Sequence, residues 1–262
     1  MCIFDIFKFK KKRNIYHNLD LHIHELICEA NNGNHHAQAQ LSLEYLIGKK
    51  CPKDLGQAFK YLELASQDYY ILNMCFKTAR ESGEPAAYFG IAMMWKHGWG
   101  VPESIEMYSK NIILAANLGY SRAQLLLGLN YKMNIYGVQE DLTQSEYWLK
   151  KAVDSDVDDA HIHLFHLYIH ESKYDKEKAT YHLLTAGNLN DGMAQIYLGR
   201  HYLEGRIFNK DIVEATKWFI LANEHDHWKF SDLEDIIKTI TIDELNIAHQ
   251  LVKEWKSKYI MH

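Results

Sequence analysis

The sequence has no excess of positive charge. Its 262 residues include 29 Lys and Arg against 34 Asp and Glu, which gives a formal net charge of −5. This balance argues against a nucleic-acid-binding protein that relies on phosphate contacts. No apolar run approaches the roughly 20 residues that a membrane-spanning helix needs. Hydrophobic residues at 47% and charged residues at 24% are in the proportions of an ordinary folded domain.

Motifs for catalysis and for cofactor binding are also missing. The chain has no Gly-x-Ser-x-Gly elbow, no His-Glu-x-x-His helix and no glycine-rich phosphate loop. Its four cysteines, Cys2, Cys28, Cys51 and Cys75, have no ligand-like spacing and are typical of free thiols in a reducing cytosol. We therefore expect no enzymatic activity and no cofactor.

The N-terminal segment places its apolar residues, 1–7, before a basic run, Lys8 to Arg13. A secretory signal has the opposite order, so we expect no export signal and a cytoplasmic protein. The alternative is a peripheral membrane contact in which Phe4, Phe7 and Phe9 insert and the lysines meet anionic headgroups. We favour an N-terminal cap with a solvated basic edge over this membrane contact.

What the sequence does contain is a repeat. Glycine, or a residue that can replace it at a helix end, recurs at steps of 34 to 37 residues, at Gly83, Gly119, Asp156, Asn190 and Asp226. A further step of 36 separates Gly33 from Tyr69. Such a period is typical of a solenoid built from helical hairpins, in which stacked units bury the faces that no unit can bury alone.

Each unit has the pattern of a helix, a loop and a second helix. The first helix carries alanine, leucine and an aromatic residue four apart, as in Ala194, Leu198 and Tyr202, on one helical face. The second helix repeats alanine, an aromatic residue and alanine, as in Ala215, Trp218 and Ala222. An aspartate precedes the second helix in four units and predicts an N-cap, at Asp54, Asp141, Asp175 and Asp211.

This order of residues resembles the Sel-one-like repeat (SLR) family, a relative of the tetratricopeptide repeat, over residues 33–226. The resemblance implies an all-α, right-handed α-solenoid. It also implies a binding role, because family members are usually adaptors in degradation complexes, in bacterial host interaction, or as immunity proteins beside secreted toxins.

The repeat divides the chain into three parts. Residues 1–32 form an N-terminal segment and capping helix, 33–226 form five SLR-type repeats, and 227–262 form C-terminal capping helices. An irregular lone helix at about 69–82 interrupts the array, because only 14 residues separate Tyr69 from Gly83. The fourth unit departs from the family pattern as well, with His182 in place of tryptophan and Ser172 to Asp175 in place of the glycine loop.

One stripe of each first helix is expected to face a protein partner, at positions one before the repeated leucine, two after it and six after it. In related repeats this stripe lines the concave surface. Adding the nearby Trp99, the partner stripe comprises Met93, His97, Trp99, Leu126, Leu129, Met133, His163, His166, His170, Tyr197, Arg200 and Glu204. An apolar groove that accepts helices or strands explains Leu126, Leu129 and Met133, and burial against adjacent helices explains them equally well.

Two patterns resemble metal sites. His163, His166 and His170 share a helix face, but no Cys or acidic ligand accompanies them, so we expect partner contacts or polar surface. Asp154, Asp156 and Asp158 imitate a calcium loop, but the sequence lacks the glycine and the closing glutamate that such a loop requires. No metal site is predicted.

The sequence thus predicts a non-catalytic, protein-binding solenoid. The resemblance narrows this to a cytoplasmic bacterial adaptor or an immunity protein that neutralises a cognate secreted toxin by binding it. The alternative is a regulatory or assembly scaffold, working at the membrane surface through the basic N-terminal segment. Neither hypothesis includes nucleic acid.

Overall fold

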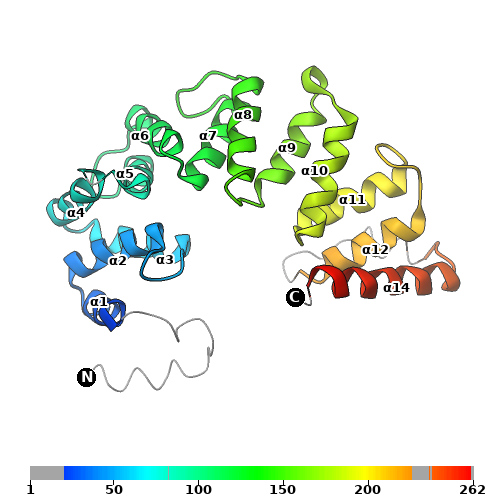
Figure 1. Ribbon diagram of the computed structural model, residues 1–262, viewed down its shortest axis with the longest axis horizontal. Helices are drawn as coiled ribbons and strands as arrows, with labels where there is room; N and C mark the ends of the chain where they lie inside the picture. The colour runs from blue at the N-terminus through cyan, green and yellow to red at the C-terminus, as the bar shows by residue number, and fades with distance from the viewer. Residues whose placement is uncertain (1–20, 82, 226–235, 237, 261–262) are drawn as a thin grey trace. The chain divides into compact units, whose positions relative to one another are not determined.

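The computed structural model describes residues 21–81, 83–225, 236 and 238–260, and the regular structure of these residues is helical throughout. The chain divides into two compact units, Met1–Glu140 and Asp141–His262. Figure 1 labels the helices in chain order. The predicted fold class, an all-helical array of helix-loop-helix repeats, is confirmed.

The N-terminal unit contains helices that pack mainly on their neighbours in sequence. They are α1 (Leu21–Asn31), α2 (His35–Ile47), α3 (Leu55–Ala65), α4 (Tyr69–Glu81), α5 (Pro85–His97), α6 (Ile105–Asn117) and α7 (Ser121–Met133). The α2–α3 and α5–α6 pairs form the largest helix contacts of this unit, while α1 packs on α2 and α7 packs on α6. The α2–α3 pair buries the alanines and the aromatic residue of the second-helix pattern, including Ala58 and Tyr61 on α3.

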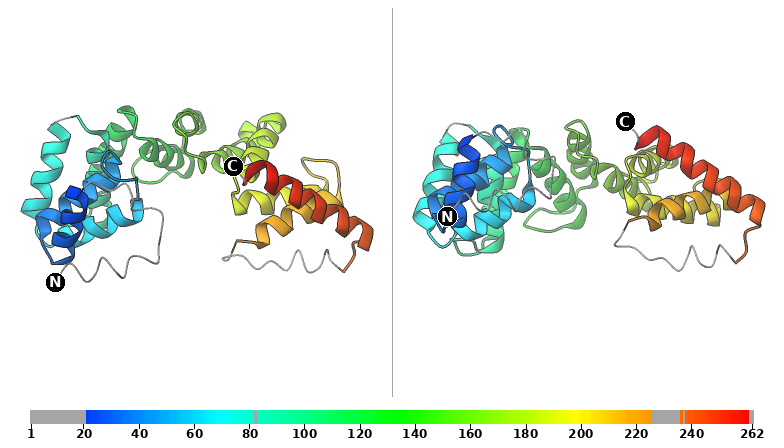
Figure 2. Two further views of the ribbon diagram at one scale, coloured as in Figure 1. Left: turned by 60° about the horizontal axis from the view of Figure 1, so that its bottom comes forward. Right: turned by 90° about the horizontal axis from the view of Figure 1, so that it is seen from below.

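The C-terminal unit repeats this arrangement. Its helices are α8 (Leu142–Val153), α9 (Ala160–Tyr168), the short 3-10 helix η2 (Glu171–Lys173), α10 (Lys176–Asn188), α11 (Gly192–Glu204), α12 (Ile212–Asn223) and α14 (Ile242–Tyr259). The α9–α10 and α11–α12 helices pack as pairs, and α14 packs on α12. Figure 2 shows α11, α12 and α14 side by side.

The predicted caps define where the second helices begin. Asp54, Asp141, Asp175 and Asp211 are the N-caps of α3, α8, α10 and α12, and each side chain accepts a hydrogen bond from a backbone N–H of the first turn. In the α5–α6 pair, where no aspartate was predicted, the Ser104 hydroxyl caps α6 by accepting from the Met107 N–H. The four predicted caps are therefore confirmed.

The helix ends follow the predicted left-handed turns with one exception. Gly83 and Gly119 have φ values of 78° and 89°, and Asp156 and Asn190 adopt the same region at 57° and 64°, as their replacement of glycine requires. Asp226 lies outside the described residues. The exception is α7, which ends at Asn134 (φ 53°), a left-handed residue outside the predicted set, because asparagine tolerates this conformation.

Helix α4 has no sequence partner and packs on α2, α3 and α5. Its Phe76 side chain is 1% exposed, and the ring lies so close to Gly90 of α5 that a methyl group on Gly90 would collide with it. The α2 side chain Leu46 reaches the same glycine. Gly90 therefore serves as a contact point for helix α4.

Glycine allows a similar close contact inside the α11–α12 pair. A methyl group on Gly199 would lie 2.8 Å from ring atoms of Phe219, which is 1% exposed. Alanine at position 199 should gain about 1 kcal/mol of helix propensity but cost about 1–3 kcal/mol through overpacking. We expect Gly199→Ala to lower the free energy of unfolding by up to about 2 kcal/mol in urea denaturation.

Gly56 provides the control, because it also lies in a helix but is exposed, with only the Asp54 carboxylate near its added methyl group. Gly56→Ala should raise the free energy of unfolding by up to about 1 kcal/mol, because it gains helix propensity without overpacking. Equal effects of the two substitutions would show that the Phe219 ring moves aside without cost.

The C-terminal helix α14 begins with a capping box, in which Thr241 and Glu244 satisfy each other's backbone N–H groups. Trp255 of this helix packs edge-on against Trp218 at 6.3 Å, and its Nε1–H donates to Asn188 Oδ1 at 2.9 Å. These contacts fit the capping role expected for this end of the chain. The other predicted capping helix, which begins at Ser231, lies largely outside the described residues.

The membrane hypothesis concerns the first thirteen residues, and these also lie outside the part of the chain that the structure describes. Among the residues described, no helix combines the length and the apolar character needed to cross a membrane.

Candidate functional site

In the N-terminal unit, the partner stripe begins on α5 and in the loop after it. Met93 is 3% exposed. It lies one turn from Gly90, on the face of α5 that α2 and α4 cover, and therefore contributes to packing. His97 is exposed and stacks on Trp99, with ring centroids 4.7 Å apart. Partial desolvation, followed by the nearby Lys96 charge, lowers the pKa of His97.

Trp99 owes its position to a tight loop. Gly98 and Gly100 on either side of it have φ values of 69° and 71°, and the Trp99 N–H donates to the Met94 carbonyl at 3.0 Å. Its ring also packs against Phe59 of α3, 6.0 Å away. The indole is thus half-buried and held by two neighbours, which is the condition in which an aromatic side chain makes an effective anchor for a partner.

Helix α7 carries the apolar part of the stripe. Leu126 and Leu129 are half-buried, whereas Met133 is 60% exposed at the last turn of the helix. Packing against adjacent helices therefore accounts for part of the surface of Leu126 and Leu129. Met133, in contrast, is an apolar side chain directed to solvent.

In the C-terminal unit, α9 and α11 bring together an aromatic group. His166 packs edge-on against Tyr197, with centroids 5.1 Å apart, and Phe165 lies 5.6 Å from the same tyrosine. His163 and Tyr197 are half-buried, and Arg200 is exposed on α11. Glu204, at the end of α11, forms an ion pair of 2.5 Å with Arg206.

His170 does not share the helical face of His163 and His166. Helix α9 ends at Tyr168, and His170 caps η2 instead, with its Nδ1 at 3.4 Å from the Ser172 N–H and 2.9 Å from the Ser172 hydroxyl. The three histidines would share one face only if α9 continued as a helix to His170. Among the described residues, His, Cys, Asp and Glu side chains form no group of three that could hold a metal ion.

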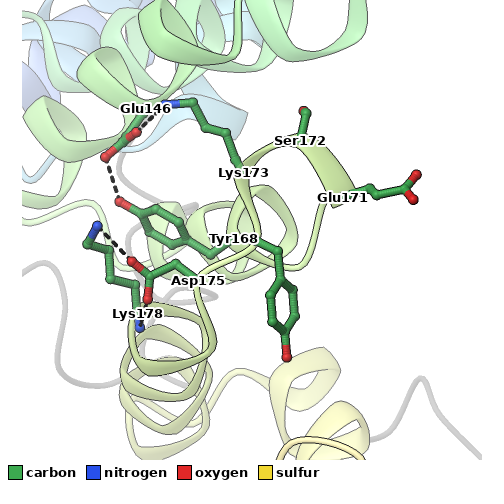
Figure 3. A pocket seen from close by; sticks show the side chains of 8 residues that line it. Glu146, Tyr168, Glu171, Ser172, Lys173, Asp175 and Lys178 are labelled. Atoms are coloured by element: carbon green, nitrogen blue, oxygen red, sulfur yellow. Dashed lines mark hydrogen bonds and ion pairs between the residues drawn. The ribbon is translucent and has the colours of Figure 1, made fainter.

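The structure also contains an open hollow that was not predicted, with a volume of about 370 Å³, beside η2 (Figure 3). At its wall the Glu146 carboxylate accepts hydrogen bonds from the Tyr168 hydroxyl at 2.8 Å and from Lys173 and Lys150 at 2.5 and 2.7 Å. The only sequence signal was the segment Ser172 to Asp175, which replaces the usual glycine loop.

The electrostatics of this hollow indicate a structural role for Glu146. Burial alone would raise the pKa of this carboxylate, but the hydrogen bonds from Lys150, Lys173 and Tyr168 outweigh burial and lower the pKa to about 2. A carboxylate that stays ionised at neutral pH is a poor general acid. Glu146 therefore ties α8 to the loop after α9 through its fixed charge.

A second unpredicted feature is a pair of buried histidines. Nδ1 of His161 on α9 and Nδ1 of His182 on α10 are 2.8 Å apart, and both residues are 8% exposed. Tyr168 stacks on His182 at 5.7 Å. Burial, and then the neighbouring His161, lower the pKa of His182 to about 4, and burial also lowers the pKa of His161. One neutral ring donates to the other, so His182 fills the family's tryptophan position with a hydrogen-bonded ring.

These helix pairs and their packing define a protein of the all-helical repeat class. A family model of the Sel1 repeat matches residues 35–69, 121–157 and 192–227. The chain therefore contains Sel1 repeats, and the resemblance seen in the sequence is confirmed. The matched ranges include α2 and α3, α7 and α8, and α11 and α12.

Two solved structures are similar in fold. One is c5321, a protective antigen present in uropathogenic Escherichia coli strains that displays an SLR fold, with a TM-score of 0.62 and 21% identity over 98% of this chain. The chain spans 61% of the length of that protein. The other is a Sel1 repeat protein from Oxalobacter formigenes, with a TM-score of 0.55 and 20% identity, covering 90% of this chain and 80% of that one. A search of curated protein sequences found no match.

Proposed function

We propose that this protein binds a single protein partner through exposed side chains of its first helices and has no enzymatic activity of its own. Met133 carries the proposal, because a side chain that is 60% exposed and apolar stands beside the half-buried Leu126 and Leu129 on one helix. Exposed apolar side chains, aromatic rings and arginines are typical of protein interfaces. Trp99, Tyr197 and Arg200 are the proposed anchors.

The more specific form of the proposal is an immunity protein, acting in the bacterial cytoplasm, that occludes a toxin delivered into the cell. Its support is the Sel1 repeats, since stacked helical repeats form extended surfaces that bind other proteins. Fold similarity alone does not identify the partner. The partner to test first is the product of the adjacent gene.

The test is co-expression of the chain with that gene product, followed by calorimetric titration. Met133→Asp combined with Arg200→Glu should weaken binding at least a hundredfold, which is the order expected for two central interface residues. Neither side chain is buried, so the variant should keep its fold. If the partner is a toxin, growth rescue by the chain should be lost in the same variant.

A matched control changes surface charge on helices that lie outside the partner stripe. Tyr147 on α8 is 50% exposed and Lys253 on α14 is exposed, so Tyr147→Asp with Lys253→Glu should retain the affinity of the parent chain. Unchanged affinity in the Met133 and Arg200 variant would remove the partner stripe from the proposed interface.

A further inference from the structure

A second pocket lies in the N-terminal unit, between α4, α5 and α6, and has a volume of about 210 Å³. Tyr69 and Arg80 line it from α4, Tyr88 and Trp95 from α5, and Lys110 from α6. None of these residues belongs to the partner stripe. The pocket is smaller than the 300–1,000 Å³ typical of small-molecule sites and is closer in size to a single bulky side chain.

The lone helix α4 creates this pocket. It packs on α2, α3 and α5, with Phe76 seated on Gly90, while α6 packs on α5 and α7. Helices α4 and α6 both pack on α5 but do not pack closely on each other, so a space remains between them. Side chains from all three helices line this space. A regular pair of repeats would have no such inserted helix.

The pocket is lined by apolar side chains and by positive but not negative charge. Ile91, Met94 and Leu114 supply apolar surface beside the Trp95 ring, and the charged lining consists of Arg80 and Lys110, with no carboxylate. Within the part of the chain that the structure describes, neither cation forms an ion pair. Two unneutralised cations at an apolar pocket, in a chain of net charge −5, are complementary to a ligand that is apolar and anionic.

We infer that this pocket receives one bulky apolar side chain of a protein partner, with a carboxylate adjacent to that side chain held by Arg80 and Lys110. The Trp95 and Tyr88 rings would cover the apolar group, and the two cations would select the acid over a neutral or basic neighbour. This inference rests on the proposed function only in assuming that the partner is a protein. It concerns a separate surface from Met133 and Arg200.

A pair of short peptides tests the inference on the full chain. Acetyl-Gly-Gly-Phe with a free C-terminal carboxylate places the apolar group and the acid on one residue, and its C-terminal amide lacks only the charge. In NMR titrations, the Trp95 indole N–H signal, assigned from Trp95→Phe, should shift with the acid and respond at least tenfold more weakly to the amide. Equal binding of both peptides, or binding of neither at 10 mM, would overturn the inference.

Charge variants complete the test. Arg80→Gln with Lys110→Gln should weaken the acid peptide about tenfold without changing the response to the amide. Lys60→Gln with Lys77→Gln removes the same charge from α3 and α4 outside the pocket and should leave the acid peptide unaffected. If free 3-phenylpropionate binds but the acid peptide does not, the pocket is a small-molecule site and a protein ligand is excluded. Because the peptides do not involve the partner stripe, their failure leaves the Met133 and Arg200 test intact.

Discussion

Replacing Phe76 with alanine should cost about 3–5 kcal/mol of stability, the usual range for removal of a fully buried phenylalanine. Phe76 is 1% exposed and fills the contact between α4 and Gly90 of α5. Since α4 has no partner helix of its own in sequence, loss of this ring should also release α4 from the unit. Urea denaturation followed by circular dichroism measures the first effect, and limited proteolysis within residues 69–81 measures the second.

Tyr70 on the same helix is the matched control, because its side chain is 72% exposed. Tyr70→Ala removes a similar aromatic group from α4 and should change the free energy of unfolding by less than about 0.5 kcal/mol. If Phe76→Ala leaves α4 as protease-resistant as Tyr70→Ala does, then other contacts attach this helix and the account given for Gly90 is wrong.

Acidification from pH 6.5 to about 4 should destabilise the protein by up to about 3 kcal/mol through the His161–His182 pair. The folded state lowers the pKa of His182 to about 4 from its ordinary value of 6.5. Above pH 6.5 the ring is neutral in both the folded and the unfolded state, so the pair adds no pH dependence. Between 6.5 and 4 the unfolded chain takes up a proton that the folded chain does not, and stability falls.

Burial is the main cause of this effect, and the charges around the pair modify it. Lys150 of α8 and Lys178 of α10 oppose protonation of His182, whereas Glu146 of α8 favours it, and Asp158 favours protonation of His161. The remaining neighbours, Tyr168 and Tyr181, contribute ring contacts. The Glu146 carboxylate titrates in a lower window, between about 4.5 and 2, so urea denaturation at pH 7 and pH 4.5 isolates the histidines.

The variant that checks the pH effect is His161→Leu with His182→Phe, which removes both partners and leaves no buried nitrogen unpaired. This variant should lose most of the stability difference between pH 7 and pH 4.5. Some pH dependence should remain from His201, because burial lowers its pKa as well. His249→Gln, at an exposed position of α14, should keep the full difference. An unchanged difference in the double variant would mean that the pair does not sense pH.

The elements of the fold were predictable because their signals are local. Each left-handed turn and each aspartate cap is read from a few neighbouring residues, and Asp54, Asp175 and Asn190 behave as the sequence indicates. The end of α7 was not predicted, because it falls at Asn134, and asparagine can adopt the left-handed turn in place of glycine.

The candidate sites were less predictable because they depend on side chains from separate elements. Nothing in the spacing of His161 and His182 shows that their Nδ1 atoms meet, and the three hydrogen bonds to Glu146 come from α8, α9 and η2. Met93 shows the converse error. A stripe rule derived from regular repeats placed it on the surface, but α5 is packed by an additional helix that the rule did not include.

The placement of caps has a consequence for how this chain could have evolved. A first helix such as α2 or α11 ends at its own glycine, and the second helix after it begins at its own aspartate. The residues that set the helix ends therefore lie within each repeat. An insertion between two repeats therefore leaves the capping residues of both repeats unchanged. The lone helix α4 occupies such a junction, where natural variation can add new surface without redesigning the array.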